Sequence, residues 1–253
     1  MLARVQNKSQ EGLLGQIDSK NLPKHLAVIM DGNGRWATQR GKLRIFGHNS
    51  AIQAVRETTE ACAELGIPFL TLYAFSTENW QRPQKEVNAL MNLLVESLNR
   101  EEETLNKNNI KLEVIGNADS LPNKTKKTLE KVIVQTTNNT RMTLILALSY
   151  SAKWDIVNSV KHIAQQVLDG EIEIDEIDEE KINNTLTTKS FPHPDLLIRT
   201  SGELRLSNFL LWELAYSEFY FTNVLWPDFQ KEHLFEAIID YQKRNRRYGN
   251  VKE

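Results

Sequence analysis

The chain has 253 residues, enough for one large domain with a sizeable core, and its formal net charge is only −2. The balanced charge gives no general field for nucleic acid, and the single cysteine, Cys62, excludes an internal disulfide. The longest apolar run, around 142–148, is far short of the ~18 residues that a membrane span needs. The first twenty residues are polar and resemble no secretory signal, so we expect a cytoplasmic protein.

Residues 1–21 are expected to form a flexible N-terminal arm before a single domain over 22–253. The apolar run 26–30 then predicts a strand buried on both faces, as central parallel strands are. This strand ends on Asp31, followed by Gly32-Asn33-Gly34-Arg35. Glycines at such a turn bring backbone N–H groups close to a ligand, and arginine suits phosphate oxygens. Because Mg²⁺ binds carboxylate and phosphate oxygens together, we predict Mg²⁺ and a diphosphate at this strand tip.

Two other interpretations of this stretch stay open. Asp-Gly and Asn-Gly are ordinary turn dipeptides, and Gly32-x-Gly34-x-x-Ala37 also fits the dinucleotide-binding fingerprint. A dinucleotide site expects an acidic residue about twenty positions on, at the tip of the next strand. The next strand ends near Phe75, far beyond that spacing, which disfavours the dinucleotide site.

A basic segment comes next, with Arg35, Arg40, Lys42, Arg44 and His48. Such runs are usually solvated loops, but one directly after a phosphate loop suits an anion clamp. A helix is predicted over 50–65, with Cys62 on its apolar side and Gly66 past its end.

The second strand, 69–75, ends in Ser76-Thr77-Glu78-Asn79-Trp80 and then Arg82. Two consecutive strands thus end in residues of the kind that bind polar ligands, and α/β sheets bind ligands at their carboxyl ends. The helix predicted over 84–105 has an apolar stripe that either faces the core or lines a hydrophobic cavity.

Further strands are predicted at 111–115 and 142–148, with helices over 121–137 and 152–168. The acidic segment 171–180 is typical of a solvated linker rather than a metal site.

A second anion-binding loop is predicted after the short strand 196–198. It contains Arg199 and Arg205, with serines around Gly202, and a helix is predicted to begin at Asn208. Arginines beside a helix N-terminus suit a diphosphate. Glu218 precedes an aromatic strand at 219–221, where it is either a paired core acid or a functional one, and a helix over 231–243 closes the domain. The pattern predicts one α/β domain with about six mostly parallel strands flanked by helices.

Five ordered motifs resemble the cis-prenyltransferase family of undecaprenyl diphosphate synthases (isoprenyl transferases), over about residues 22–249. They are 25–37, 40–48, 73–83, 197–212, and Glu218 with 225–229. The resemblance implies repeated condensation of isopentenyl diphosphate onto an allylic diphosphate such as farnesyl diphosphate, giving a long cis-polyprenyl chain such as undecaprenyl diphosphate. It also implies a hydrophobic tunnel, with walls that we expect from 69–75, 84–105 and 142–148. Leu204 stands where some members carry histidine, so it takes no role.

The resemblance also implies roles for single residues. Asp31 is the metal carboxylate for Mg²⁺ and Glu218 a second metal-associated acid, while Asn79 holds the position of the family's proposed proton acceptor. A neutral amide is a poor base, so we expect Asn79 to orient the alkene or a relay, and a diphosphate oxygen to take the proton. The allylic diphosphate is assigned to Gly32, Asn33, Gly34, Arg35, Arg44 and His48. The lining of the reacting site is assigned to Trp36, Ser76, Thr77, Glu78, Asn79, Trp80 and Arg82, and isopentenyl diphosphate to Arg199, Arg205, Leu206 and Ser207.

The resemblance further implies a homodimer in which Arg247 and Gly249 reach a diphosphate in the neighbouring subunit. The lipid product suggests transient contact with a membrane surface. A non-catalytic accessory subunit is the remaining alternative, and the intact set of Asp31, Asn79 and Arg199 argues against it.

Overall fold

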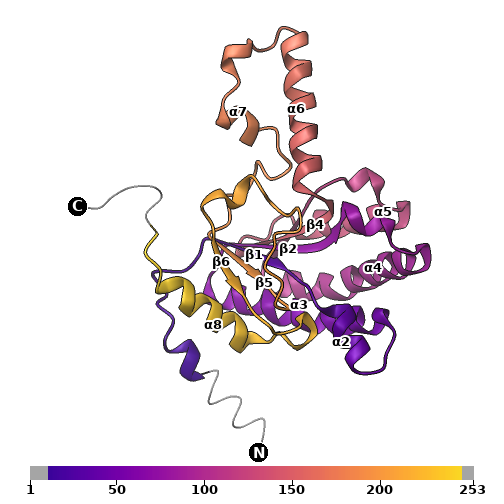
Figure 1. The fold of residues 1–253 in the computed structure, drawn as a ribbon, viewed down its shortest axis with the longest axis vertical. Helices are drawn as coiled ribbons and strands as arrows, with labels where there is room; N and C mark the ends of the chain where they lie inside the picture. The colour runs from indigo at the N-terminus through magenta and orange to yellow at the C-terminus, as the bar shows by residue number, and fades with distance from the viewer. Residues whose placement is uncertain (1–10, 247–253) are drawn as a thin grey trace, which may run out of the picture.

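The computed structural model describes residues 11–246, and its framework is a parallel β-sheet (Figure 1). Within this range the strands lie in the order β3-β4-β2-β1-β5-β6, and every pair of neighbours is parallel. The strands are β1 (His25–Ile29), β2 (Phe69–Ser76), β3 (Ile110–Ile115), β4 (Met142–Tyr150), β5 (Leu196–Arg199) and β6 (Glu218–Phe221). The predicted α/β class and parallel sheet are therefore confirmed.

The helices are α2 (Asn33–Gln39), α3 (Arg44–Leu65), α4 (Gln84–Lys107), α5 (Asn123–Thr136), α6 (Ala152–Leu168), α7 (Glu179–Asn183) and α8 (Lys231–Gln242). Short 3₁₀ turns lie between them: η1 (Thr77–Gln81), η2 (Ala118–Ser120), η3 (Ile174–Glu176), η4 (Glu213–Tyr216) and η5 (Trp226–Asp228). Within residues 11–246, none of the helices has the length and apolarity needed to cross a membrane.

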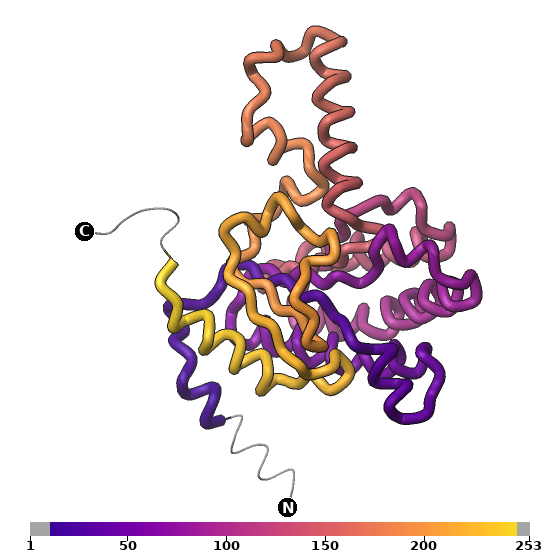
Figure 2. Tube along the Cα trace, viewed as in Figure 1, coloured from indigo at the N-terminus to yellow at the C-terminus, as the bar shows by residue number. Residues whose placement is uncertain are grey.

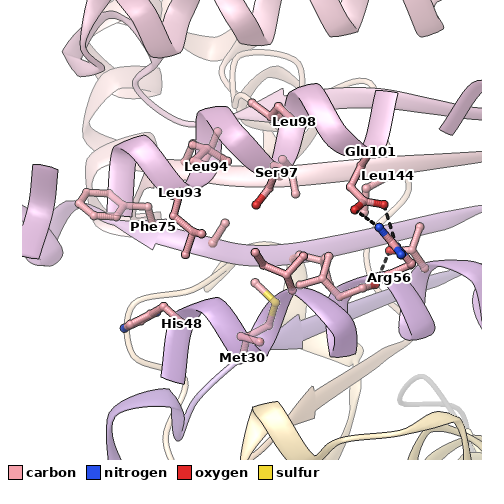
Figure 3. Close-up of a pocket in the computed structure, with 18 of the residues that line it drawn as sticks. Met30, His48, Arg56, Phe75, Leu93, Leu94, Ser97, Leu98, Glu101 and Leu144 are labelled. Carbon is pink, nitrogen blue, oxygen red and sulfur yellow. Dashed lines mark hydrogen bonds and ion pairs between the residues drawn. The ribbon is translucent and has the colours of Figure 1, made fainter. Parts of the chain in front are cut away.

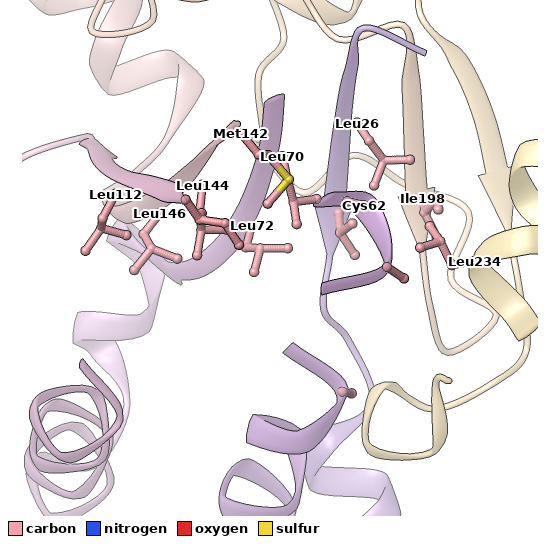
Figure 4. Packing of buried hydrophobic residues seen from close by; sticks show 14 of the residues in the cluster. Leu26, Cys62, Leu70, Leu72, Leu112, Met142, Leu144, Leu146, Ile198 and Leu234 are labelled. Atoms are coloured by element: carbon pink, nitrogen blue, oxygen red, sulfur yellow. The ribbon is translucent and has the colours of Figure 1, made fainter. Parts of the chain in front are cut away.

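Each face of the sheet carries its own apolar cluster. The larger cluster joins β-strand leucines such as Leu70 and Leu72 to Cys62 of α3 and Leu234 of α8 (Figure 4). The smaller cluster covers the opposite face, where the ring of Phe209 stacks on that of Tyr73 with centroids 4.3 Å apart. Because β1 is covered on both faces, all five of its residues are buried, as the apolar run that begins at Leu26 predicts for the last four.

The segment containing α6 and α7 projects away from the sheet as an arm (Figures 1 and 2). The Ser151 hydroxyl caps the start of α6 by accepting a hydrogen bond from the Trp154 N–H at 3.3 Å. Val157, Val160 and Leu168 are exposed along this helix. The arm therefore carries apolar surface that no other part of residues 11–246 covers.

The structure differs from the sequence-based expectation at two places near the strand tips. The segment 44–49 is the first part of α3 rather than a basic loop, and α2 follows Asp31 almost directly. No helix begins at Asn208, so that prediction was wrong. Ser207, Asn208 and Leu210 have φ angles of 49°, 61° and 46°, which are left-handed conformations incompatible with a helix start.

Part of the N-terminal arm lies against the end of α8. The Gln242 side-chain amide donates to the carbonyl oxygens of Asp18 and Asn21, at 2.8 and 2.9 Å. The Asp18 backbone N–H donates in return to the Gln242 side-chain oxygen at 3.0 Å. Residues near 18–21 are therefore joined to the body of the domain.

Candidate active site

Asp31 and Arg199 meet where β1 and β5 end side by side. The register pairs Ile29 with Arg199, so the two chain ends leave the sheet at the same level. Arg199 Nη2 donates to Asp31 Oδ2 at 2.8 Å, and the Thr200 hydroxyl donates to the Asp31 carbonyl oxygen at 2.7 Å. At β1 the connections change direction across the sheet, and such a switch point is where open α/β sheets bind ligands.

The Asp31 carboxylate is held in its charged form. Burial alone would raise its pKa, but the hydrogen bonds from Arg199 and from the Gly32 N–H outweigh burial and lower the pKa below its ordinary value. The Gly32 N–H lies 2.7 Å from Asp31 Oδ1. The side chain remains 34% exposed, so the carboxylate is both ionised and accessible.

Arg199 is itself buried and organises the loop that follows β5. Its Nη1 donates to the carbonyl oxygen of Arg205 and, at 2.7 Å, to the hydroxyl of Ser207. Its Nε is buried without a hydrogen-bond partner among the described residues. The Arg199 guanidinium thus holds both predicted ligand loops, the one after β1 and the one after β5. Its Nε–H remains available to donate to a further group.

Arg35 reaches from α2 toward the same loop. Its Nη2 donates to the Ser201 hydroxyl at 2.5 Å and lies 3.1 Å from Glu203 Oε1. The other Glu203 oxygen accepts from Arg205 Nη1. The two arginines assigned to different diphosphates therefore share one carboxylate, a role for Glu203 that the sequence did not indicate.

Two glycines allow the close approach of backbone at this corner. Gly32 has φ 107°, a conformation that side chains rarely adopt. A Cβ on Gly47 would lie 1.8 Å from the Asn33 carbonyl oxygen, so α2 and α3 can pack together only with glycine there.

The tip of β2 is tied to the loop after β5. Glu78 Oε1 accepts from the Asn208 side-chain amide at 2.8 Å, and the Thr77 hydroxyl donates to Glu78 Oε2 at 3.2 Å. Asn79 Oδ1 accepts from the Ser76 backbone N–H at 3.2 Å. The three strand tips predicted to meet, those of β1, β2 and β5, therefore do meet.

His48 and Asn33 supply unpaired polar atoms beside this cluster. His48 Nε2 and Asn33 Oδ1 are buried with no partner among the described residues. Burial, and then the nearby charge of Arg82, lower the pKa of His48 to about 4, so the ring is neutral at pH 7. Buried orphan groups of this kind mark a site shaped for a polar ligand.

A cavity of about 270 Å³ extends from this corner between the helices and the sheet (Figure 3). Its mouth includes Asn33, His48, Asn79 and Arg82, and its walls are mostly leucines from β2, β4 and α4. The three segments from which the tunnel wall was expected all line this cavity. Residues 48–60 of α3 form another wall, which the sequence-based prediction did not include although most of this stretch lies in the helix predicted over 50–65.

Several predicted site residues have different surroundings. The Trp36 indole N–H donates to Asp228 at 2.7 Å, and that of Trp80 donates to the Ser149 hydroxyl at 2.9 Å. Leu206 packs against the smaller apolar cluster. Arg247 and Gly249 lie outside the described residues.

Glu218 is not near Asp31 within the chain. It pairs with Leu196 at the amino end of β5, level with Leu26, so it lies roughly 16 Å before Asp31 along the strand direction. Its carboxylate binds Arg244 Nη1 at 2.8 Å. A metal ion on Asp31 therefore cannot also be held by Glu218 of the same chain.

Asp31 fits a metal that is bound together with a diphosphate. Among residues 11–246, no three His, Cys, Asp or Glu side chains are arranged to hold an ion by themselves. One carboxylate, phosphate oxygens and water are a common ligand set for Mg²⁺. The surrounding arginines would attract the diphosphate that completes this set.

Two proteins that are similar to this chain in sequence are named as an undecaprenyl-diphosphate synthase and an isoprenyl transferase. The chain is 51% identical to the ditrans,polycis-undecaprenyl-diphosphate synthase ((2E,6E)-farnesyl-diphosphate specific) of Pasteurella multocida over 238 residues, 94% of this chain and 99% of that protein. It is 50% identical to the isoprenyl transferase of Heliobacterium mobile, over 96% of this chain and 94% of that protein.

Two solved structures also have the fold of this chain. The lavandulyl diphosphate synthase from Lavandula x intermedia, in complex with dimethylallyl diphosphate, superposes with a TM-score of 0.89 at 36% identity, over 91% of this chain and all of that one. A probable undecaprenyl diphosphate synthase from Campylobacter jejuni gives 0.75 at 32% identity with the same coverage. The family model "Putative undecaprenyl diphosphate synthase" matches residues 29–249. The chain belongs to the undecaprenyl diphosphate synthase family of prenyltransferases.

Proposed function

We propose that this protein condenses isopentenyl diphosphate repeatedly onto an allylic diphosphate, farnesyl diphosphate being the expected primer, to make undecaprenyl diphosphate for a cell-wall lipid carrier. The observation that carries the proposal is that a polar, cationic corner lies next to an apolar cavity. Asn33, two residues after Asp31, lines the apolar cavity together with Arg82, so the polar corner that holds Asp31 and Arg199 adjoins the cavity. The corner suits diphosphates and the cavity suits a growing hydrocarbon.

The described residues have the roles that such a condensation requires. The allylic C–O bond breaks, a C–C bond forms to the alkene, and one proton leaves. Arg35 and the first backbone N–H groups of α2, which have no acceptor within the helix, stabilise the charge that gathers on the departing diphosphate. Asn79 cannot accept the proton, because its amide is neutral and its oxygen already accepts from Ser76. The amide therefore orients the alkene, and a diphosphate oxygen receives the proton.

Asp31 is the residue that would hold Mg²⁺, together with oxygens of a diphosphate. When bound, the ion neutralises negative charge on that diphosphate. Incubation with radiolabelled isopentenyl diphosphate and farnesyl diphosphate, with Mg²⁺ or with EDTA, tests both proposals. Labelled long-chain lipid that forms only with Mg²⁺ is the expected result. Absence of labelled lipid under all conditions would reject the prenyltransferase function, and lipid formed in EDTA would reject the metal.

We further propose that two copies form a homodimer. The exposed apolar side chains of the α6–α7 arm support this, because a second copy would bury them. Mixed dimers test the sharing of sites, with Asp31→Ala in one subunit and Arg247→Ala in the other. If Arg247 serves the neighbouring site, both lesions fall in one site and up to about half the activity returns. No recovery after verified subunit exchange would contradict sharing.

The proposed work on a lipid product also calls for contact with the cytoplasmic membrane surface. Leu43 and Phe46 are 74% and 47% exposed at the start of α3, and the Lys42 ammonium lies 5.9 Å from the Phe46 ring centre. Exposed apolar and basic side chains together suit an anionic bilayer. Leu43→Ser with Phe46→Ser should reduce cosedimentation with anionic vesicles, and unchanged cosedimentation would contradict this contact.

A further inference from the structure

Arg56 and Glu101 form an ion pair between α3 and α4 at the end of the cavity far from the diphosphate corner. Arg56 Nε donates to Glu101 Oε2 at 3.0 Å, and Nη2 donates to Oε1 at 2.5 Å. Both side chains line the cavity. Figure 3 shows them at the opposite end of the lining from His48 and Phe75, with the side chains of Leu94, Ser97 and Leu98 on α4 between.

The length of α4 gives the scale of this separation. The lining starts at Leu90 on this helix, and Glu101 lies about three turns further on, roughly 16 Å at 1.5 Å per residue. A hydrocarbon that grows from the diphosphate corner first fills the space among the leucines, and it must fold there because an extended undecaprenyl chain is far longer than this separation. It then meets a pair of full charges held in bidentate geometry.

The two side chains of the ion pair line the cavity and are also partly exposed to solvent. Beyond the pair, Leu105 of α4 and Ile110 of β3 are only 5% and 1% exposed, so this part of the lining is closed off from solvent. The Arg56 and Glu101 side chains keep exposures of 35% and 19%, which places them where the space between α3 and α4 approaches the surface. Nearby lining residues on the helix side are also polar: Thr59, Glu60 and Thr104.

From this placement we infer that the Arg56–Glu101 pair sets the upper limit of product length, by closing the outlet between α3 and α4 to hydrocarbon. The inference rests on the proposed prenyltransferase function. Burial of each added isoprene unit against leucine favours elongation, whereas contact with the pair displaces water from two charges. The free-energy gain from adding another isoprene unit therefore ends where the hydrocarbon reaches the two charged side chains.

Four variants test the charge rather than the shape of this outlet. Arg56→Met with Glu101→Met makes the outlet apolar, and Glu101→Gln removes one charge. The exchange Arg56→Glu with Glu101→Arg keeps the pair in reverse. Glu102→Gln is the matched control, because Glu102 neighbours Glu101 on α4 but pairs with Lys131 of α5, at 2.8 Å.

Product lengths are read by chromatography of the dephosphorylated lipid, together with the rate of the first addition to farnesyl diphosphate. The Met/Met variant should lengthen the main product by one or more isoprene units, and Glu101→Gln should shift it in the same direction. The exchange and Glu102→Gln should keep the wild-type length, and first-addition rates should stay within threefold of wild type.

Wild-type lengths in both Met/Met and Glu101→Gln would overturn the inference, and so would lengthened products from the exchange. If the Met/Met variant does not fold, the product lengths of Glu101→Gln and of the exchange variant still test the inference. A wild-type enzyme that makes no lipid at all rejects the proposed function instead, so the two failures are distinguishable.

Discussion

Replacing Asp31 by asparagine would keep the shape of the side chain and remove the charge that Arg199 binds. The bond of 2.8 Å is charge-assisted, and such bonds contribute about 1.5–3 kcal/mol. Because Asp31 is 34% exposed, we take the lower part of that range, about 1.5–2 kcal/mol. For a chain of this size, each kcal/mol shifts Tm by roughly 2–4 °C, so we expect a fall of roughly 3–8 °C.

The loss of activity should be far greater than the loss of stability. Asp31→Asn weakens the proposed metal ligand and with it the neutralisation of charge on the diphosphate, and losing one such stabilising group typically lowers kcat by about 10²–10³. The assay is incorporation of labelled isopentenyl diphosphate over a Mg²⁺ titration, with Tm measured on the same samples. Asp169→Asn is the control, because this carboxylate accepts from the Gln165 side-chain amide at 2.8 Å at the end of α6, away from the strand tips (Figure 1). Activity of Asp31→Asn within tenfold of wild type, with an unchanged Mg²⁺ profile, would refute the assigned role.

Three further predictions concern other residues of the site and the core. Arg205→Ala should raise KM for isopentenyl diphosphate about tenfold, which corresponds to about 1.4 kcal/mol of binding free energy. The expected effect is modest because the Arg205 side chain is 60% exposed, and an exposed donor binds a diphosphate less strongly than a buried one. A change only in the allylic KM would reverse our assignment of the two diphosphates. Gly47→Ala should lower Tm and activity together, since its Cβ would lie 1.8 Å from the Asn33 carbonyl oxygen; wild-type values would show that α2 and α3 can separate freely. The pKa values of His25 and His48 are lowered from 6.5 to about 4, mainly by burial, so the stability they contribute is present above pH 6.5 and is lost as the pH falls toward 4. Urea unfolding at pH 7 and pH 5 should differ by about 2 kcal/mol for each histidine, and equal stabilities would contradict the shifts.

The strand tips were predictable because each is encoded locally. An apolar run followed by ligand-type residues marks Asp31 and Ser76, and parallel strands bring such tips to one edge. The helix expected at Asn208 was wrong because asparagine suits both an N-cap and the left-handed conformation that it adopts here. Nothing local distinguishes these two uses.

Pairs between distant side chains could not be predicted in the same way. Arg56 and Glu101 are 45 positions apart, and their contact depends on how α3 and α4 rotate and pack. The sharing of Glu203 by Arg35 and Arg205 depends likewise on the path of the loop after β5. Charge alone indicates neither partner, because the chain has 31 basic and 33 acidic residues from which to choose.

The central position of β1 has a consequence for how the chain is made. Its neighbours are β2, which follows within fifty residues, and β5, which starts at Leu196. Until the ribosome has released β5, one side of β1 is an unpaired apolar edge of the kind that invites association with other chains. Arg199 arrives with that same strand, so the edge is covered and the Asp31 carboxylate is secured in one late step. A nascent chain that stops before β5 should therefore be both inactive and prone to aggregate.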